Sequence, residues 1–379
     1  MSSNIDLVLI ATLMASQGFP VPSFVAASKE YYNDSNLLSA IKDLASPIHK
    51  RTRLMHACKI GDIKRVKTLI RAKAGVNAVS QQYLTPLILA ILKGNIDIVT
   101  LLLEAGANPN FPLKDSNYPL TLSILSGKIE LVKVLVLWGA DVNVRNARGI
   151  TPLMLACEIG ITHIAEFLID SGADVNDASF TDECTPLYYA CLKGKDEIVS
   201  LLLDRGALVD KLVQNKVTPL MYAAAENHIE VCEILIDYRA DVNAVDKDGC
   251  TPLMMACESG NTAIVELLIN SGADLEKRQS NFEGMTALLF ACDRGYFDAA
   301  ILLVNAGADV NIATLNNETT PLMWAAVHGN MELVRCLVEK GANITASHTD
   351  TDWTAESYAD ARKHTDISTY LRCMKERVQ

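Results

Sequence analysis

The chain has 379 residues, is 50% hydrophobic, and carries a formal net charge of −11. This balance argues against general nucleic-acid binding, which depends on clustered Lys and Arg. No stretch reaches the roughly 18 apolar residues of a membrane span, so we expect no integral membrane segment.

The first 50 residues contain no clear repeat. Residues 7–15, LVLIATLMA, are as apolar as the core of a secretion signal. The segment before them has Asp6 and no Lys or Arg, whereas a signal peptide begins with positive charge. Residues 35–45, SNLLSAIKDLA, have helical spacing. We therefore expect residues 1–50 to form an N-terminal helical cap, with a targeting segment as the alternative.

From residue 51 onward a single motif recurs. TPLMLACEIG at residues 151–160 returns as TPLMMACESG at residues 251–260. Spacings of 33 to 35 residues separate the motif starts, which are Thr52, Thr85, Tyr118, Thr151, Thr185, Thr218, Thr251, Thr286, Thr320 and Thr354. A fixed period of this length predicts a solenoid, in which each unit buries its apolar face against its neighbours.

Each unit is predicted to contain two helices. Thr-Pro begins the first helix with a capping hydroxyl and a residue that needs no N–H at that position. Nine residues after the Thr, a glycine such as Gly94 or Gly160 ends it in left-handed conformation; Asn227 is the exception. A second amphipathic helix such as EIVSLLLDRG (197–206) follows, and a GADVN-like segment leads into a polar turn.

These motifs resemble the ankyrin repeat, whose signature is T-P-L-H-x-A-A-x-x-G with G-A-D-V-N. The resemblance implies an all-α repeat solenoid: a curved stack of helix-turn-helix units with β-turn fingers and helical caps at both ends. We expect nine repeats at 51–353 and a C-terminal capping half-repeat at 354–379.

The sequence departs from the family pattern at several positions. The family His is replaced by Met in five units, and we expect a softer apolar contact there. Lys73 and Arg239 replace a glycine, so those units are expected to be weaker locally. Asn of the D-V-N turn is hydroxylated in some family members, but turn formation explains these residues, which are Asn110, Asn143, Asn176, Asn243 and Asn311.

The ten cysteines follow the repeat rather than a disulfide pattern. Five occupy the same small position of the first helix: Cys58, Cys157, Cys191, Cys257 and Cys292. Equivalent positions in stacked units lie on the order of 10 Å apart, too far for a disulfide. We expect buried free thiols, a reducing compartment and a cytoplasmic location, with a nuclear one as the alternative.

No catalytic or metal motif is present. The chain lacks HExxH, GxSxG, a phosphate loop and GxGxxG, and His56, His163, His228 and His328 occupy four different repeat offsets. No cysteine spacing suits zinc. We therefore expect no catalysis, no cofactor, no metal and no small-molecule substrate.

The residues that vary between units predict a partner site. Side chains four and eight residues after each Thr lie on the face of the first helix that lines the concave groove in the ankyrin family. From the fifth unit this face becomes aromatic and bears a polar rim, and the residue before each Thr adds to it. The predicted partner-binding residues are Tyr189, Tyr222, Met255, Phe290 and Trp324, with Lys193, Glu226, Arg294 and His328 as the rim, and Met285 and Trp353 beside them.

The sequence thus favours a monomeric, non-catalytic scaffold or adaptor that binds other proteins along this groove. One alternative is an exported or membrane-targeted effector, in which residues 1–25 are an address and the array binds a target. A cryptic enzyme is a second alternative, but the sequence nominates no residue for it.

Overall fold

The computed structural model describes residues 3–4, 31–32, 53–81, 83–113, 117–281 and 283–378. The described part contains ten consecutive helix pairs. The chain divides into two compact units, one formed by Met1–Tyr189 with Asp204–Ala207 and the other by Ala190–Leu203 with Leu208–Gln379. The predicted all-α repeat solenoid is confirmed within each unit.

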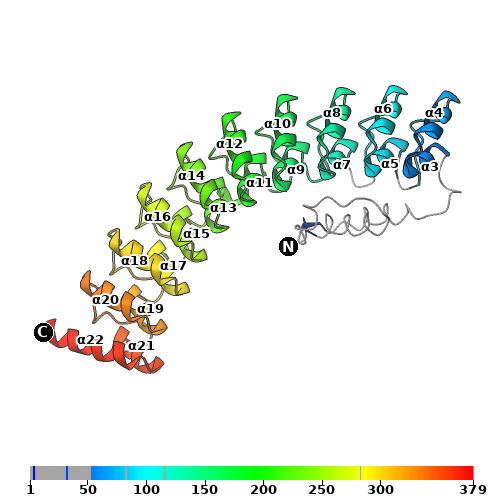
Figure 1. Cartoon of the computed structure of the whole chain (residues 1–379). Helices are drawn as coiled ribbons and strands as arrows, with labels where there is room; N and C mark the ends of the chain where they lie inside the picture. The colour runs from blue at the N-terminus through cyan, green and yellow to red at the C-terminus, as the bar shows by residue number, and fades with distance from the viewer. Residues whose placement is uncertain are drawn as a thin grey trace. The chain divides into compact units, whose positions relative to one another are not determined.

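Four helix pairs belong wholly to the first unit (Figure 1). They are α3 (Arg53–Ile60) with α4 (Ile63–Arg71), α5 (Pro86–Lys93) with α6 (Ile96–Glu104), α7 (Pro119–Leu125) with α8 (Ile129–Leu137), and α9 (Pro152–Ile159) with α10 (Thr162–Asp170). Each first helix packs on its own second helix, and α3, α5 and α7 each also pack on the next first helix. The core is therefore a continuous layer, with fully buried side chains such as Ile98 and Leu131.

The helices α11 (Pro186–Leu192) and α12 (Asp196–Asp204) lie where the chain passes between the units. The second unit continues after the short 3-10 turn η4 (Gln214–Lys216) and repeats the same packing. Its pairs are α13 (Pro219–Ala225) with α14 (Ile229–Asp237), α15 (Pro252–Ser259) with α16 (Thr262–Asn270), α17 (Ala287–Arg294) with α18 (Phe297–Asn305), α19 (Pro321–His328) with α20 (Met331–Glu339), and α21 (Ala355–Arg362) with α22 (Thr365–Val378).

The N-terminal segment contains the one pair of strands in the described residues. Strand β1 (Ser3–Asn4) pairs antiparallel with β2 (Tyr31–Tyr32). The helix expected at residues 35–45, and the cap it was to form, lie outside the described residues. No helix in the described ranges is long and apolar enough to cross a bilayer.

The predicted helix signals are confirmed. Thr85 Oγ1 accepts the N–H of Ile88 at 3.2 Å, and Thr251 Oγ1 accepts that of Met254 at the same distance. The closing glycines are left-handed, with φ of 69° at Gly94 and 90° at Gly160, and Asn227 substitutes with φ of 63°. These caps fix where each first helix begins and ends, and so which of its side chains face outward.

The methionine that replaces the family His also contacts the backbone N–H of the capping Thr in two repeats. The Thr151 N–H lies 3.5 Å from the sulfur of Met154, and the Thr218 N–H lies 3.4 Å from that of Met221. In these two repeats the buried Met side chain therefore adds a polar contact to the expected softer apolar one. The thioether is a weak acceptor, and it satisfies the N–H of the capping residue.

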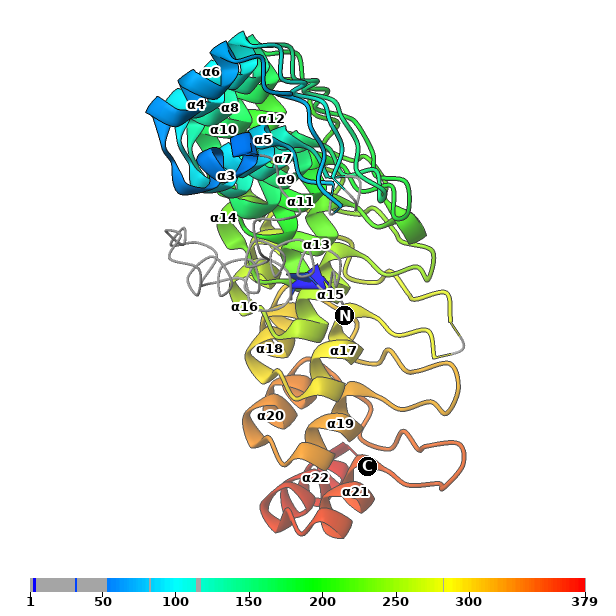
Figure 2. The ribbon, with the colours of Figure 1, turned by 90° about the vertical axis from the view of Figure 1, so that its right-hand side faces the viewer.

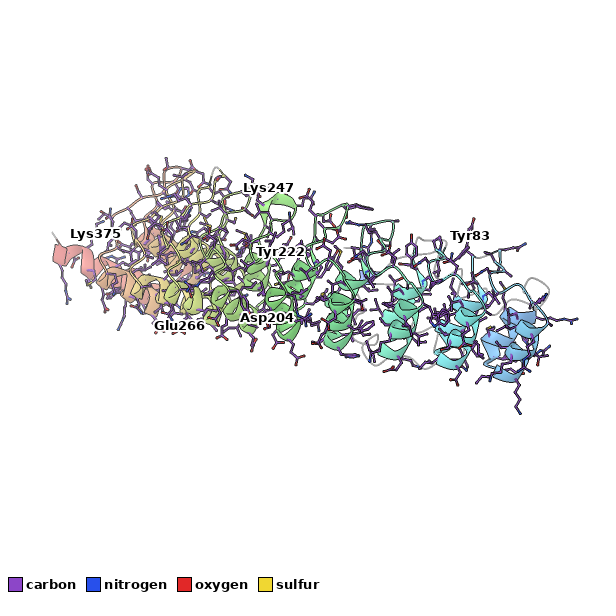
Figure 3. The ribbon with its side chains drawn as sticks, turned by 90° about the horizontal axis from the view of Figure 1, so that it is seen from above. Tyr83, Asp204, Tyr222, Lys247, Glu266 and Lys375 are labelled. Atoms are coloured by element: carbon purple, nitrogen blue, oxygen red, sulfur yellow. The ribbon has the colours of Figure 1, made fainter. Side chains whose placement is uncertain are left out.

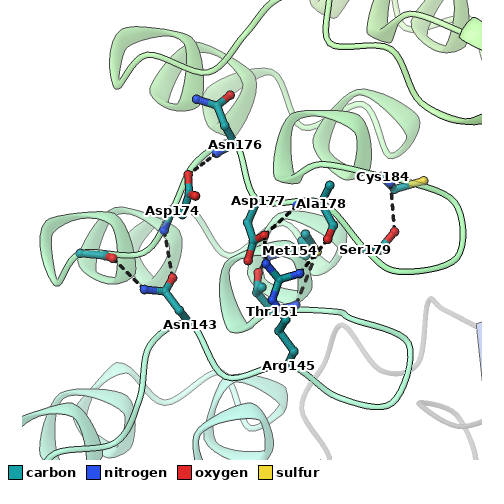
Figure 4. Close-up of polar contacts among 11 residues, drawn as sticks. Asn143, Arg145, Thr151, Met154, Asp174, Asn176, Asp177, Ala178, Ser179 and Cys184 are labelled. Carbon is teal, nitrogen blue, oxygen red and sulfur yellow. Dashed lines mark hydrogen bonds and ion pairs between the residues drawn. The ribbon is translucent and has the colours of Figure 1, made fainter.

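In each repeat, the loop that leads to the next helix pair projects to one side of the helices, and we call these loops fingers (Figure 2). Turn asparagines connect successive repeats at their base. Asn143 donates through Nδ2 to the Gly172 carbonyl at 3.1 Å, and its Oδ1 accepts the Asp174 N–H at 3.0 Å (Figure 4). The same two-way bridge is made by Asn77, Asn110, Asn243 and Asn311. We call this series the asparagine ladder.

The ten cysteines are free, and seven of them are buried. Burial raises the pKa of the Cys58 and Cys232 thiols to about 12. For Cys157 and Cys257, burial raises the thiol pKa still further. The thiolate is the reactive species, so these side chains are both shielded and un-ionised near neutral pH.

We therefore expect a graded reaction with iodoacetamide at about pH 8. Exposed Cys373 should be alkylated first, partly exposed Cys250 and Cys336 more slowly, and the buried thiols after unfolding in urea. Pulsed alkylation followed by peptide mass spectrometry measures the order. Rapid labelling of Cys157 or Cys257 in the native protein would contradict the packing described here.

Candidate functional site

The side chains four and eight residues after each motif Thr form what we call the first-helix face. In the second unit it is carried by α13, α15, α17 and α19, whose caps hold these positions in register. Figure 3 shows Tyr222 on this face, with Lys247 on a finger and Glu266 on the edge formed by the second helices.

Exposure divides the predicted partner-binding residues of the second unit. Tyr222, Met255 and Trp324 are partly exposed. Phe290 is 7% exposed and Met285 is 5% exposed, so both belong largely to the core. Trp353, which precedes the last motif Thr, is 41% exposed. A partner can therefore reach four of these six side chains, which are Tyr222, Met255, Trp324 and Trp353.

Two other predicted residues lie at the division between the units. Tyr189 is the last residue of the first segment of the first unit, and Lys193 belongs to the second unit. Both side chains are partly exposed. The Tyr189 ring meets the Tyr188 ring edge to face, with centroids 5.4 Å apart and planes at 83°. This geometry is typical of stable aromatic pairs.

An aromatic cluster surrounds His328, which is exposed at the C-terminal end of α19. Its ring centroid lies 6.2 Å from that of Trp324 and 5.8 Å from that of Phe297. His328 Nε2 is 3.0 Å from the carbonyl oxygen of Asp293. A carbonyl only accepts, so Nε2 carries the proton and donates, which fixes the ring against the preceding repeat.

The indole N–H of Trp324 is buried and has no hydrogen-bond acceptor among the described residues. A buried donor without an acceptor costs about 1–3 kcal/mol. Trp324 thus lies on the first-helix face with an indole N–H that no described residue accepts.

Together with Glu258 and Asp293, which lie beside Arg294, the polar rim of the face has three carboxylates against two cations, Lys193 and Arg294. Arg294 pairs with Glu258 at 2.8 Å and approaches Asp293 at 3.8 Å, and these carboxylates offset its charge. Glu226 is exposed on the same face. Exposed ion pairs of this kind add little stability, so we assign the Arg294 pair to the electrostatics of the face rather than to folding.

The net charge of the chain lies in the second unit. That unit has 27 acidic and 16 basic residues, whereas the first unit has 18 of each. The aromatic half of the first-helix face therefore belongs to the unit that carries the whole formal charge of −11.

A set of contacts that the sequence reasoning missed joins consecutive repeats near this face. The residue just before a second helix lies against the end of the first helix of the preceding repeat: His228 Nε2 lies 3.3 Å from the Leu192 carbonyl, and His364 Nε2 lies 3.3 Å from that of Val327. Asn261 makes the same bond to Ala224 at 2.7 Å. His228, Asn261 and His364 differ in residue type, but they share one repeat offset, ten residues after the motif Thr.

Within the described residues, no group of three or more His, Cys, Asp or Glu side chains is placed to hold a metal ion. The histidines nearest the face make the inter-repeat contacts described above, and none is paired with a nucleophile in the described hydrogen bonds.

A family model for ankyrin repeats, described as three copies, matches residues 24–112, 120–211, 177–246, 220–314 and 312–378. No curated protein matches the chain. The family match covers most of the sequence and agrees with the repeated helix pairs, their Thr and Gly caps and the asparagine ladder. The chain therefore belongs to the ankyrin-repeat family.

Proposed function

We propose that this protein is a non-catalytic scaffold or adaptor that binds a partner protein along the first-helix face of its second unit. Ankyrin repeats generally mediate protein–protein interaction. The observation that supports this site is the exposure of Tyr222, Met255 and Trp324 on one face of stacked helices, with Trp353 beside them. In this proposal residues 51–353 supply the repeats and residues 354–379 close the array.

The chemistry of the face specifies the kind of segment it binds. Aromatic side chains contribute strongly when a partner covers them, and Tyr and Trp are the residues most often found at binding hot spots. The same rings attract Lys and Arg through cation–π contacts of about 0.5–2 kcal/mol. Because Glu226, Glu258 and Asp293 line the rim, a segment that alternates basic and apolar residues complements the face.

A comparative capture experiment tests the proposal. One bait is the wild-type chain and the other carries Tyr222→Ala, Met255→Ala and Trp324→Ala. Phe290 is left intact because its replacement would open a core cavity. We expect a partner that the wild type retains to be depleted at least about tenfold from the variant, as the loss of a hot-spot contact predicts.

The matched control carries Tyr238→Ala and Val245→Ala, two exposed apolar residues of the second unit that lie outside the first-helix face. Both variants must first show the wild-type circular dichroism and melting curve. Equal capture by all three baits would refute the site. Depletion from the face variant alone supports it, and the partner's sequence then shows whether a basic and apolar segment is present.

A further inference from the structure

Positive charge is concentrated in the first described repeat, which belongs to the first unit. Residues 53–81 contain seven Lys or Arg and one acidic residue, Asp62, although the first unit as a whole is balanced. Five of these basic residues are exposed on α4 and the turn after it, and we call them the basic face: Lys64, Arg65, Lys67, Arg71 and Lys73.

Helix geometry aligns three of these residues. Lys64, Lys67 and Arg71 are spaced at i, i+3 and i+7, which places them along one side of α4 over about 10 Å. Val66 is buried and holds the opposite side of the helix against the repeat. α4 is the second helix at the blue end of the array in Figure 1.

The positive charge of this face is not neutralised by the described residues. None of the ion pairs found in the described ranges involves any of the five side chains. Asp62 instead caps the helix, because its Oδ1 accepts the Arg65 N–H at 3.0 Å. Like charges at helical spacing repel one another, and a bound anion would relieve that repulsion.

A depression lies at the C-terminal end of the same helix. Its volume is ≈ 580 Å³, and Lys73 is the one charged residue in its lining. The apolar side chains that line it come from the end of α4, the following turn and the end of α6: Ile70, Ala74, Val76, Ala78 and Ala105. Glu104 is exposed beside Ala105, so the approach from the α6 side is acidic while the approach along α4 is basic.

We propose that the basic face and this depression together bind an acidic peptide segment of a partner protein, one apolar residue followed by several Asp or Glu. The apolar side chain enters the depression beside Lys73. The carboxylates then run along α4 past Arg71, Lys67 and Lys64, away from Glu104. At about 3.3 Å per residue, three or four extended residues span this distance. A planar lipid surface or a nucleic acid would use the charges but leave the apolar depression empty.

Fluorescence anisotropy tests this with labelled Phe-Glu-Glu-Glu-Glu and Ser-Glu-Glu-Glu-Glu peptides and the full chain. We expect the Phe peptide to bind more tightly than the Ser peptide, and binding to weaken as salt rises. Lys64→Glu, Lys67→Glu and Arg71→Glu together should reduce affinity at least about tenfold, because they reverse the attraction without lowering helix propensity.

The control variant makes the same charge change elsewhere, with Lys211→Glu, Lys247→Glu and Lys340→Glu, three exposed lysines of the second unit. Both variants are first checked by circular dichroism. Equal weakening in the two variants overturns the proposal, and so does equal affinity for the Phe and Ser peptides. Tighter binding to vesicles with about one-third phosphatidylserine, or to an oligonucleotide of matched charge, also overturns it in favour of those partners.

Discussion

Replacing Gly149 with Ala is expected to destabilise the protein by about 3 kcal/mol. Gly149 is buried in a finger and has a φ of +79°, a conformation that an L-residue adopts with difficulty. A Cβ atom there would lie 2.5 Å from the backbone nitrogen of Phe180 in the next finger. That nitrogen donates to the Arg148 carbonyl at 3.0 Å, so relief of the clash would separate the fingers and break their hydrogen bond.

The control for this substitution is Gly172→Ala. Gly172 has a φ of +90°, but nothing lies within 4 Å of an added Cβ. The Gly172→Ala variant should lose about 1 kcal/mol of unfolding free energy, which is the strain of the left-handed conformation alone. Urea unfolding followed by circular dichroism compares the two. A second variant, Gly149→Ala with Phe180→Ala, should not recover stability, because the nearest clash is with backbone. Equal losses at the two glycines, or recovery in the double variant, would show that the fingers do not meet as described.

Local signals in the sequence were sufficient to predict the repeated helices. A capping hydroxyl and a left-handed glycine act within a few residues of themselves, so Thr85, Thr251 and Gly160 could be assigned without knowledge of the fold. The two substituted glycine positions also follow this logic. Lys73 and Arg239 retain positive φ, at 59° and 68°, because the repeat imposes the turn on whichever residue occupies it.

The depth of each side chain could not be predicted in the same way. Phe290 and Trp324 occupy the same repeat position, yet Phe290 is buried and Trp324 is partly exposed. Exposure depends on which side chains of the neighbouring repeats cover the position. The ion pairs of the polar rim could not be predicted for the same reason. Arg294 pairs with Glu258, which lies 36 residues earlier in the sequence. The positive charge of residues 53–81, in contrast, can be read directly from the sequence, because seven Lys or Arg stand there with one acidic residue.

Asp210 interrupts the asparagine ladder, and we expect Asp210→Asn to stabilise the second unit by about 1 kcal/mol at neutral pH. Asp210 accepts the Asp241 N–H at 3.2 Å on each carboxylate oxygen, as a ladder asparagine accepts through Oδ1. A carboxylate has no N–H to offer the next carbonyl, which at this position belongs to Arg239. Asparagine keeps the accepted bond and can add the donated one, as Asn243 does to Gly272 at 3.2 Å.

The pH dependence of this gain identifies its cause. Partial burial raises the pKa of the Asp210 carboxyl, and the nearby Asp241 charge adds to the increase. A raised pKa in the folded state means that the ionised form is disfavoured by folding, so the stability present at acid pH is lost as pH rises through that pKa. Asp210→Asn should therefore give its largest gain near neutral pH and a smaller gain near pH 4, measured as the shift of the urea midpoint. A gain that does not change with pH would assign the effect to the new hydrogen bond alone.

The reverse exchange, Asn243→Asp, provides the matched test because the two positions are equivalent in adjacent repeats of the same unit. It removes the hydrogen bond to the Gly272 carbonyl and places a carboxylate beside Asp274. We therefore expect it to lower the free energy of unfolding by about 1 kcal/mol. This loss should depend on pH in the same way as the contribution of wild-type Asp210. If both exchanges left the urea midpoint unchanged, water would satisfy these backbone groups equally well. Opposite shifts would show that the ladder sets the strength of each repeat interface, and that Asp210 marks a weak interface within the unit that carries the proposed binding face.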